Sequence, residues 1–375
     1  MNRNTIAYFV SSHGFGHLTR SLALMEYMLD TTDYSFYLCT APRHIEFAKI
    51  YLADYGDRVE YSEFLIDVGI INYPNSLKVD VPSTDKAVYQ LLETYEPRAE
   101  EEAEKLTKAG VRLIINDISA FACLVAKKTG INIVSLGNFT WVDQYKCLGV
   151  AQDIVDKFME MYSYCHNYIA YDLALSLTGA PEGTVFRSEY LTSRPIDEGR
   201  IASIRKEFTE KYFEKFGKQP KNFLFVSVGQ SADLPEVNIK NFEGVVFYTR
   251  GIEFDPQKYE NILFYLLPLE IKDSQSFVAA ADLAISKAGW TTAAEAVVGH
   301  AKILLMERPG VDDDMSTINC LKAKGLAASL TTDEVIDLDY TMLYNRAATE
   351  IDLKKLSGVK NDVPEICEKL LSYIQ

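Results

Sequence analysis

The chain has 375 residues, of which 48% are hydrophobic and 24% charged, so it can form one large or two ordinary α/β domains and is not of the disordered class. Its formal net charge of −15 argues against a nucleic-acid partner, because phosphate binding draws on clustered Lys and Arg. No apolar run approaches the roughly 20 residues of a membrane span. Six widely separated cysteines without a Cys-x-x-Cys pair predict reduced thiols in a cytoplasmic protein.

The first half of the chain alternates strand-like and helix-like stretches. Apolar runs predict strands at 5–10, 35–39, 111–116 and 131–136. Helical periodicity or composition predicts helices at 18–29, 43–52, 93–108 and 120–129. Such alternation implies a parallel sheet with helices on both faces.

The pattern blurs in the middle of the chain and then restarts. Residues 151–171 read as helical, and 178–200 as a linker or crossover. Strands are predicted again at 223–228, 245–249, 262–266, 283–286 and 302–306. We therefore expect two doubly wound domains, roughly 1–195 and 196–358, facing a cleft. Ligands of such sheets bind beyond the carboxyl ends of the strands.

The first glycine turn is S-S-H-G-F-G-H-L-T-R at 11–20, between the first strand and the first helix. A dinucleotide fingerprint would need a third glycine and an acidic residue after the second strand, and both are missing. The glycines could simply permit a tight turn. The functional alternative is that Gly14 and Gly16 bring backbone amides and His17 to the cleft, at the positive end of a helix.

An acidic residue, Asp117, ends the strand at 111–116, on the same edge of the predicted sheet as His17. An Asp beside a His fixes the imidazole tautomer and stabilises its protonated form while the His removes a hydroxyl proton. His13 is the rival for the role of the base. The structural alternative for Asp117 is a cap on the following helix.

A second glycine turn follows the strand at 283–286. The amides of Gly289, Trp290, Thr291 and Thr292 could hold a diphosphate at the start of a helix. Glu295, one turn further on, could accept hydrogen bonds from both ribose hydroxyls. Thr292-x-x-Glu295 is equally a capping box, and spacing alone leaves both alternatives open.

This second turn resembles the donor-binding signature of GT-B glycosyltransferases in the run K-A-G-W-T-T-A-A-E-A-V-V-G. It is similar above all to the plant small-molecule glycosyltransferases, and also to the peptidoglycan N-acetylglucosaminyltransferase. The resemblance implies that residues 289–292 bind the donor diphosphate and Glu295 the ribose, with Lys287 in place of the family's phosphate-binding histidine. The loop Gly229-Gln230-Ser231 is similar to the one that faces the phosphates from the other side.

The first glycine turn agrees with this resemblance. His17 falls on the basic histidine of these enzymes, and Asp117 on its partner. The N-terminal domain of plant L-arabinokinase is similar too, sharing H-G-F-G-H-x-T-R and N-F-[ST]-W. The residues that we expect on the acceptor side are His13, Gly14, Gly16, Arg20, Asn138 and Trp141. Trp141 could instead be a core anchor, and Arg20 could only form a salt bridge.

One departure from the family lies before Asn319, where Met315 and Ser316 replace the residues that usually contact the donor sugar. Asp313 or Asp314 could take over the sugar hydroxyls. A metal site there is not expected, because the acidic run has no His or further acid nearby. The alternative for this run is a solvated helix N-terminus.

The resemblance implies an inverting, metal-independent glycosyltransferase with no cofactor, using a nucleotide-sugar donor, with UDP as the expected nucleotide. It also implies that a last helix, within 359–375, packs back on the N-terminal domain. The acceptor, whether small molecule, glycan or lipid-linked, is not specified. A non-catalytic nucleotide-sugar sensor or regulatory subunit and a UDP-sugar epimerase are the alternatives.

Overall fold

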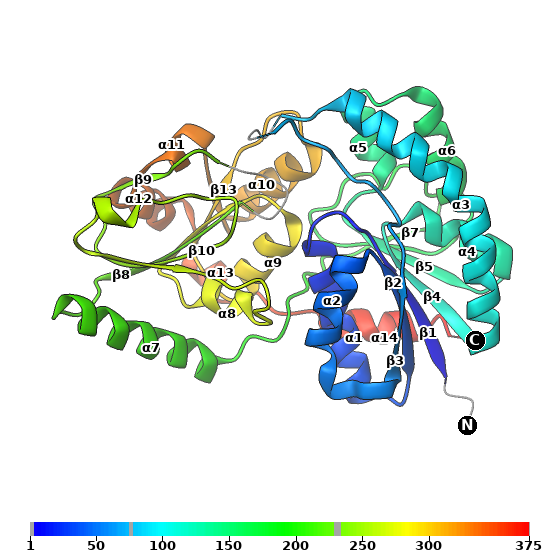
Figure 1. The fold of residues 1–375 in the computed structure, drawn as a ribbon, viewed down its shortest axis with the longest axis horizontal. Helices are drawn as coiled ribbons and strands as arrows, with labels where there is room; N and C mark the ends of the chain where they lie inside the picture. The colour runs from blue at the N-terminus through cyan, green and yellow to red at the C-terminus, as the bar shows by residue number, and fades with distance from the viewer. Residues whose placement is uncertain (1–3, 75–77, 229–233, 375) are drawn as a thin grey trace.

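The computed structural model describes residues 4–74, 78–228 and 234–374, and these residues contain two large parallel sheets (Figure 1). In these residues the first sheet has seven strands in the order β3-β2-β1-β4-β5-β6-β7. All of its strand pairs are parallel. Its strands are β1 (Thr5–Val10), β2 (Ser35–Thr40), β3 (Val59–Glu63), β4 (Val111–Asp117), β5 (Ile133–Gly137), β6 (Tyr168–Ala170) and β7 (Val185–Arg187).

Helices cover both faces of this sheet, as the alternation in the sequence predicts. They are α1 (Gly16–Thr31), α2 (Pro42–Tyr51), α3 (Val81–Ala109), α4 (Ala120–Thr129), α5 (Trp141–Leu148) and α6 (Gln152–Tyr162), with a 3-10 turn at Ala53–Arg58. Strand β1 shows how the faces divide. Ile6 and Tyr8 join the core that includes α1, whereas Ala7 and Phe9 join the core beneath α3 and α4.

The second sheet repeats this plan with the order β11-β10-β8-β12-β13-β14. Its strands are β8 (Asn222–Ser227), β10 (Gly244–Tyr248), β11 (Ile262–Leu266), β12 (Leu283–Lys287), β13 (Ile303–Met306) and β14 (Ala328–Leu330). Around it lie α7 (Glu198–Phe216), α8 (Ser274–Ala279), α9 (Trp290–Val298), α10 (Asp312–Lys324), α11 (Thr332–Ile336), α12 (Tyr340–Glu350) and α13 (Leu353–Leu356). A 3-10 turn at Pro256–Lys258 and a small pair, β9 (Asn238–Lys240) with β15 (Asp337–Asp339), complete it.

The last helix, α14 (Val363–Leu371), lies against α1 of the first sheet's layer (Figure 1). Ile366 and Leu370 are fully buried, and the Cys367 thiol lies 3.6 Å from the carbonyl oxygen of Leu24. The chain therefore crosses between the two sheet layers twice. The exact boundaries at 195/196 and 358/359 stay predictions.

The predicted helix at 151–171 is wrong in its second part, because α6 ends at Tyr162 and 168–170 form strand β6. The predicted linker at 178–200 likewise contains strand β7. Both strands have three residues, which is too short for a periodic pattern to appear in the sequence. Tyr168 is nevertheless 2% exposed, because its side chain packs in the core with residues of α4 and α6.

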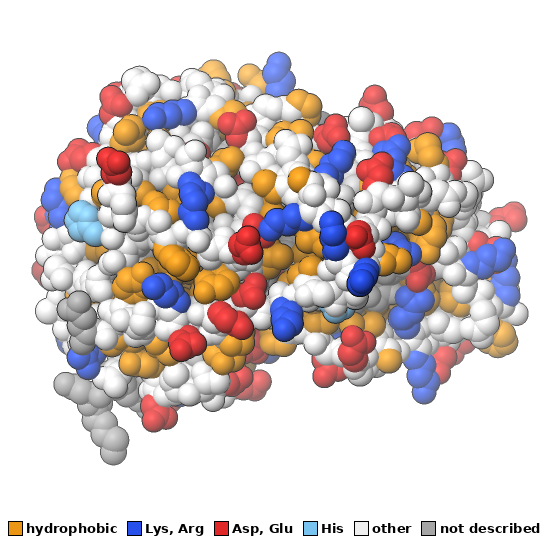
Figure 2. All heavy atoms as spheres, turned by 180° about the vertical axis from the view of Figure 1, so that it is seen from behind, with side chains coloured by type: hydrophobic (Ala, Val, Ile, Leu, Met, Phe, Trp, Pro, Cys, Tyr) orange, Lys and Arg blue, Asp and Glu red, His pale blue; other side chains and the backbone are white. Residues whose placement is uncertain are grey.

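The surface carries mixed charge. Figure 2 shows basic and acidic side chains interspersed over the back of the molecule, without a large patch of one sign on that face. Among the described helices, none is both long and apolar enough to span a bilayer.

Candidate functional site

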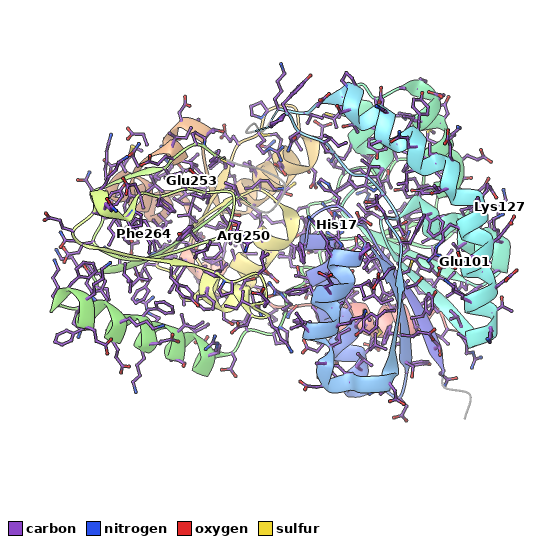
Figure 3. The ribbon with its side chains drawn as sticks, viewed as in Figure 1. His17, Glu101, Lys127, Arg250, Glu253 and Phe264 are labelled. Atoms are coloured by element: carbon purple, nitrogen blue, oxygen red, sulfur yellow. The ribbon has the colours of Figure 1, made fainter. Side chains whose placement is uncertain are left out.

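The two sheets turn their topological switch points toward one cavity of about 220 Å³. One switch point lies between β1 and β4, and the other between β8 and β12. The labelled His17 lies between the two lobes in Figure 3. The predicted site residues on its wall are His13, Gly14, Gly16, His17, Arg20, Asn138, Trp141, Lys287, Gly289, Trp290, Thr291, Thr292, Glu295, Asp313 and Asp314.

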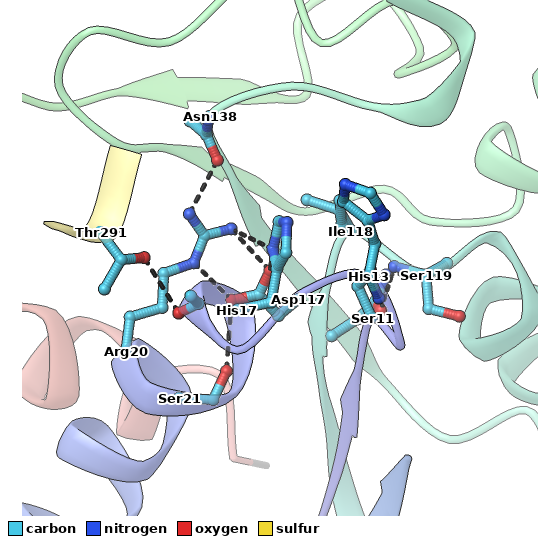
Figure 4. Close-up of polar contacts among 12 residues, drawn as sticks. Ser11, His13, His17, Arg20, Ser21, Asp117, Ile118, Ser119, Asn138 and Thr291 are labelled. Carbon is cyan, nitrogen blue, oxygen red and sulfur yellow. Dashed lines mark hydrogen bonds and ion pairs between the residues drawn. The ribbon is translucent and has the colours of Figure 1, made fainter. Parts of the chain in front are cut away.

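At the first switch point, His17, Arg20 and Asp117 form one buried network (Figure 4). The Nδ1 atom of His17 lies 2.8 Å from Asp117 Oδ1. Arg20 donates to both oxygens of Asp117, from Nε at 2.7 Å and from Nη2 at 2.6 Å. Arg20 Nη2 also lies 2.9 Å from His17 Nδ1. The guanidinium thus shares the carboxylate with the imidazole.

Local structure explains why these side chains meet. Gly14 has φ +66, which a residue with a side chain rarely adopts, and helix α1 begins two residues later. His17 and Arg20 are one turn apart on this helix, so they lie on one face. Asp117 is the last residue of β4, in register with Val10 at the end of β1. The cap of α4 is Ser119, so the alternative role of Asp117 as a helix cap is wrong.

The charges of the network shift the pKa values of its members. Burial and the charge of Arg20 lower the pKa of His17, and Asp117 opposes this only in part. Burial alone would raise the pKa of Asp117, but Arg20 and His17 lower it to about 2. The imidazole is therefore neutral and the carboxylate ionised at neutral pH, which is the state a general base needs.

Asn138 connects this network to the second domain. Its side-chain oxygen accepts from Arg20 Nη1 at 2.7 Å, and its amide nitrogen donates to Asp313 Oδ1 at 2.5 Å. Burial raises the pKa of Asp313 to about 7, with the neighbouring Asp314 adding to the effect. Asp314 is itself buried, and its Oδ2 lies 3.1 Å from Nη1 of Arg308. The acidic run is therefore not simply a solvated helix end.

The second switch point contains the start of helix α9. Gly289 occupies its cap position without a side-chain cap, so the capping box of Thr292 and Glu295 is not formed. Trp290 Nε1 donates to the carbonyl of Asp172 at 2.7 Å, and the Thr291 hydroxyl donates to the carbonyl of Gly16 at 2.9 Å. The glycine turns of the two domains are thus in direct contact.

Glu295 is held by an arginine that the sequence did not reveal. Arg194 donates from Nε at 2.8 Å and from Nη2 at 3.1 Å to the two carboxylate oxygens. Arg194 also donates to the carbonyl of Lys272 and to the hydroxyl of Ser274. It lies in the crossover between the domains, where no motif or periodicity marked it.

Two further predicted residues, Lys287 and His13, line the cavity. Lys287 ends β12 at the cavity wall, and burial lowers its pKa. His13 packs edge-on against Trp141 with ring centroids 5.4 Å apart, and burial lowers its pKa well below the usual value. The loop Gly229-Gln230-Ser231 lies outside the described residues.

Comparisons with known proteins agree with this architecture. No family model matches the chain. Solved structures that align over nearly its whole length include LpCGTa in complex with UDP, with 99% of both chains covered, 13% identity and a TM-score of 0.65. Arabidopsis thaliana UGT89C1 complexed with UDP-L-rhamnose aligns over 100% of both chains, with 9% identity and a TM-score of 0.64. The chain has the GT-B fold of glycosyltransferases.

Two further proteins are similar to this chain. MurG of Acinetobacter baumannii aligns over 98% of this chain and 99% of its own, with 11% identity and a TM-score of 0.52. L-arabinokinase of Arabidopsis thaliana is 26% identical over 207 residues, which are 54% of this chain. The match covers 19% of that kinase, so the chain resembles a part of it and is a distant homologue.

Proposed function

We propose that this GT-B protein is a glycosyltransferase that moves a sugar from a UDP-linked donor to a hydroxyl acceptor with inversion. The observation that carries the proposal is the meeting of two unlike half-sites at one cavity. A neutral His17 beside Asp117 lies on one wall. The start of helix α9, with Lys287 and Arg308, lies on the other.

The second half-site suits a diphosphate. The helix start offers backbone amides and the positive end of the helix dipole. Lys287 and Arg308 add positive charge on the same wall. Together these groups would stabilise the negative charge that a departing UDP acquires. The UDP named in the solved relatives' complexes is consistent with this donor.

The first half-site suits proton removal. The His17 tautomer with hydrogen on Nδ1 donates to Asp117 and leaves a lone pair on Nε2. In the proposed step Nε2 takes the proton of the acceptor hydroxyl, whose oxygen forms a bond to the anomeric carbon. The bond from that carbon to the diphosphate oxygen breaks, and UDP leaves with the electron pair. Asp117 then stabilises the imidazolium.

The test is release of UDP from a panel of UDP-sugars. His17→Ala should lower turnover by about 10²–10⁴-fold, the usual contribution of a general base, while leaving UDP affinity intact. His166→Ala, which alters an exposed histidine, is the matched control. Turnover should also survive chelation by EDTA. Retained turnover in His17→Ala would exclude His17 as the base.

A nucleotide-sugar sensor is the second candidate, and a specific observation favours it. Glu295 is already paired with Arg194, and Thr291 is already bonded to Gly16 across the domains. These contacts would have to rearrange for a donor to bind, as in a protein that reports binding by a change of domain arrangement. A sensor would bind UDP-sugars in calorimetry without releasing UDP.

A further inference from the structure

One end of the cavity contains a buried amide that has no partner. Gln144 lies on α5 with 1% of its surface exposed, and it contributes to the cavity wall. Neither its side-chain nitrogen nor its side-chain oxygen has a hydrogen-bond partner among the described residues. Buried polar groups in proteins are nearly always paired, so an amide left open on both atoms indicates a ligand contact.

The surroundings of Gln144 are polar as well as aromatic. Trp141, which is fully buried on the same helix and also lines the cavity, interacts through its side chain with Asp67. Asp67 is 1% exposed, and its Oδ1 accepts from the Ser11 hydroxyl and the Ser12 amide. Trp141 and Asp67 are thus neighbours of each other, whereas both polar atoms of Gln144 stay open among the described residues.

This end of the cavity adjoins the proposed base. The ring centroid of Phe139 lies 5.7 Å from that of His17 and 5.4 Å from that of Trp141. Phe139, Trp141 and Gln144 all line the cavity. A molecule that reaches the amide of Gln144 would therefore lie against aromatic side chains with its near end at His17.

Burial shifts the titratable groups at this end toward their neutral forms, and it raises the pKa of Asp67 to about 7. Burial lowers the pKa of His13 well below its usual value, so this neighbour is neutral. The two charged side chains beside the base, Arg20 and Asp117, are bonded to each other, and Arg20 also donates to Asn138. Binding an anionic or cationic acceptor here would leave its charge desolvated and unmatched.

We infer that this end of the cavity is an acceptor subsite for an uncharged polyhydroxylated molecule, a sugar or cyclitol, held by a vicinal diol on the Gln144 amide. An amide offers one donor and one acceptor side by side, which matches two neighbouring hydroxyls, and the aromatic side chains suit the CH faces of a sugar ring. The inference rests on the proposed function and specifies its acceptor.

The test combines turnover with stability. With the donor that the UDP-sugar panel identifies, we expect myo-inositol or methyl α-D-glucopyranoside to accelerate UDP release, and cyclohexanol and 4-nitrophenol not to. Gln144→Leu should raise the KM for the polyol by about tenfold or more. It should leave the Tm unchanged or higher, because the open amide contributes nothing to the unliganded fold. Gln152→Leu, at an exposed glutamine on α6, is the matched control for both measurements.

The possible failures are distinguishable. If UDP and UDP-sugars do not bind, the proposed function fails. If the donor is bound and hydrolysed but only 4-nitrophenol, or no polyol, accelerates UDP release, the acceptor inference alone is overturned. A clear fall in Tm for Gln144→Leu, absent in Gln152→Leu, would also overturn it, because Gln144 would then have a structural partner.

Discussion

The residue that most changes the chemistry expected at the base is Arg20. It is 1% exposed and donates to both oxygens of Asp117, and its positive charge opposes the effect by which that carboxylate raises the pKa of His17. Arg20 lines the cavity, and its hydrogen-bond contacts are with Asp117, His17 and Asn138. We propose that it acts through them as a positioning residue.

We predict that Arg20→Gln shifts the acid limb of kcat/KM to higher pH. The base must be neutral, and removal of the guanidinium removes a charge that lowers the pKa of His17 while leaving Asp117, which raises it. Activity at pH 6 should then fall relative to activity at pH 8, as a pH–rate profile would show. Arg20→Lys, which keeps a positive charge, and exposed Arg187→Gln are the controls. An acid limb that does not move would mean that His17 is not the titrating group.

At the scale of elements, the meeting of His17 and Asp117 could be predicted because parallel strands end at one edge of a sheet. The same rule locates Gly289 and Lys287 at the second edge. It could not locate Arg194, Asp67 or Gln144. Arg194 lies in the crossover between the domains. Asp67 follows strand β3, which the sequence did not predict, and Gln144 lies on the short helix α5, which was not predicted either. Their importance depends on tertiary contacts, which leave no local pattern in the sequence.

The next prediction concerns Glu295 on helix α9. We expect Glu295→Gln to weaken UDP binding by about 1–3 kcal/mol, because the variant loses hydrogen bonds to a charged group. The amide keeps the shape of the side chain and one acceptor for Arg194, so the fold should survive. Calorimetry measures the affinity, and exposed Glu253→Gln is the control (Figure 3). Unchanged affinity would restrict Glu295 to holding Arg194 in the crossover.

At the scale of the whole molecule, the chain passes between the two sheet layers twice, once near Ser193 and once near Asn361, and these two segments are bonded to each other. The Ser193 amide donates to the side chain of Asn361 at 3.0 Å, and Asn361 donates back to the Ser193 carbonyl at 2.7 Å. Arg194, the partner of Glu295, is the next residue of the first crossing. The second crossing leads into α14, which rests on the N-terminal layer. A movement of one domain against the other would therefore act on Arg194 and Glu295 through these two hydrogen-bonded segments.

The last prediction concerns α14, which supplies part of the core under the first sheet although it follows the second domain in the chain. Ile366 is fully buried in the core that contains α1. Ile366→Ala should destabilise the N-terminal layer by about 2–5 kcal/mol, through lost apolar burial and a residual cavity. Two domains need not unfold together, so calorimetry can show two transitions. We expect the Tm of one of them to fall by roughly 4–15 °C.

Adding UDP identifies which of the two transitions belongs to the N-terminal layer. UDP binds only the folded donor domain in our proposal, so it should raise the transition that Ile366→Ala leaves unchanged, through mass action. Phe213→Ala is the control, since that side chain lies on α7 and is 51% exposed. If the variant instead lowered the transition that UDP raises, α14 would stabilise the donor domain, and the contact with α1 would contribute little to the first.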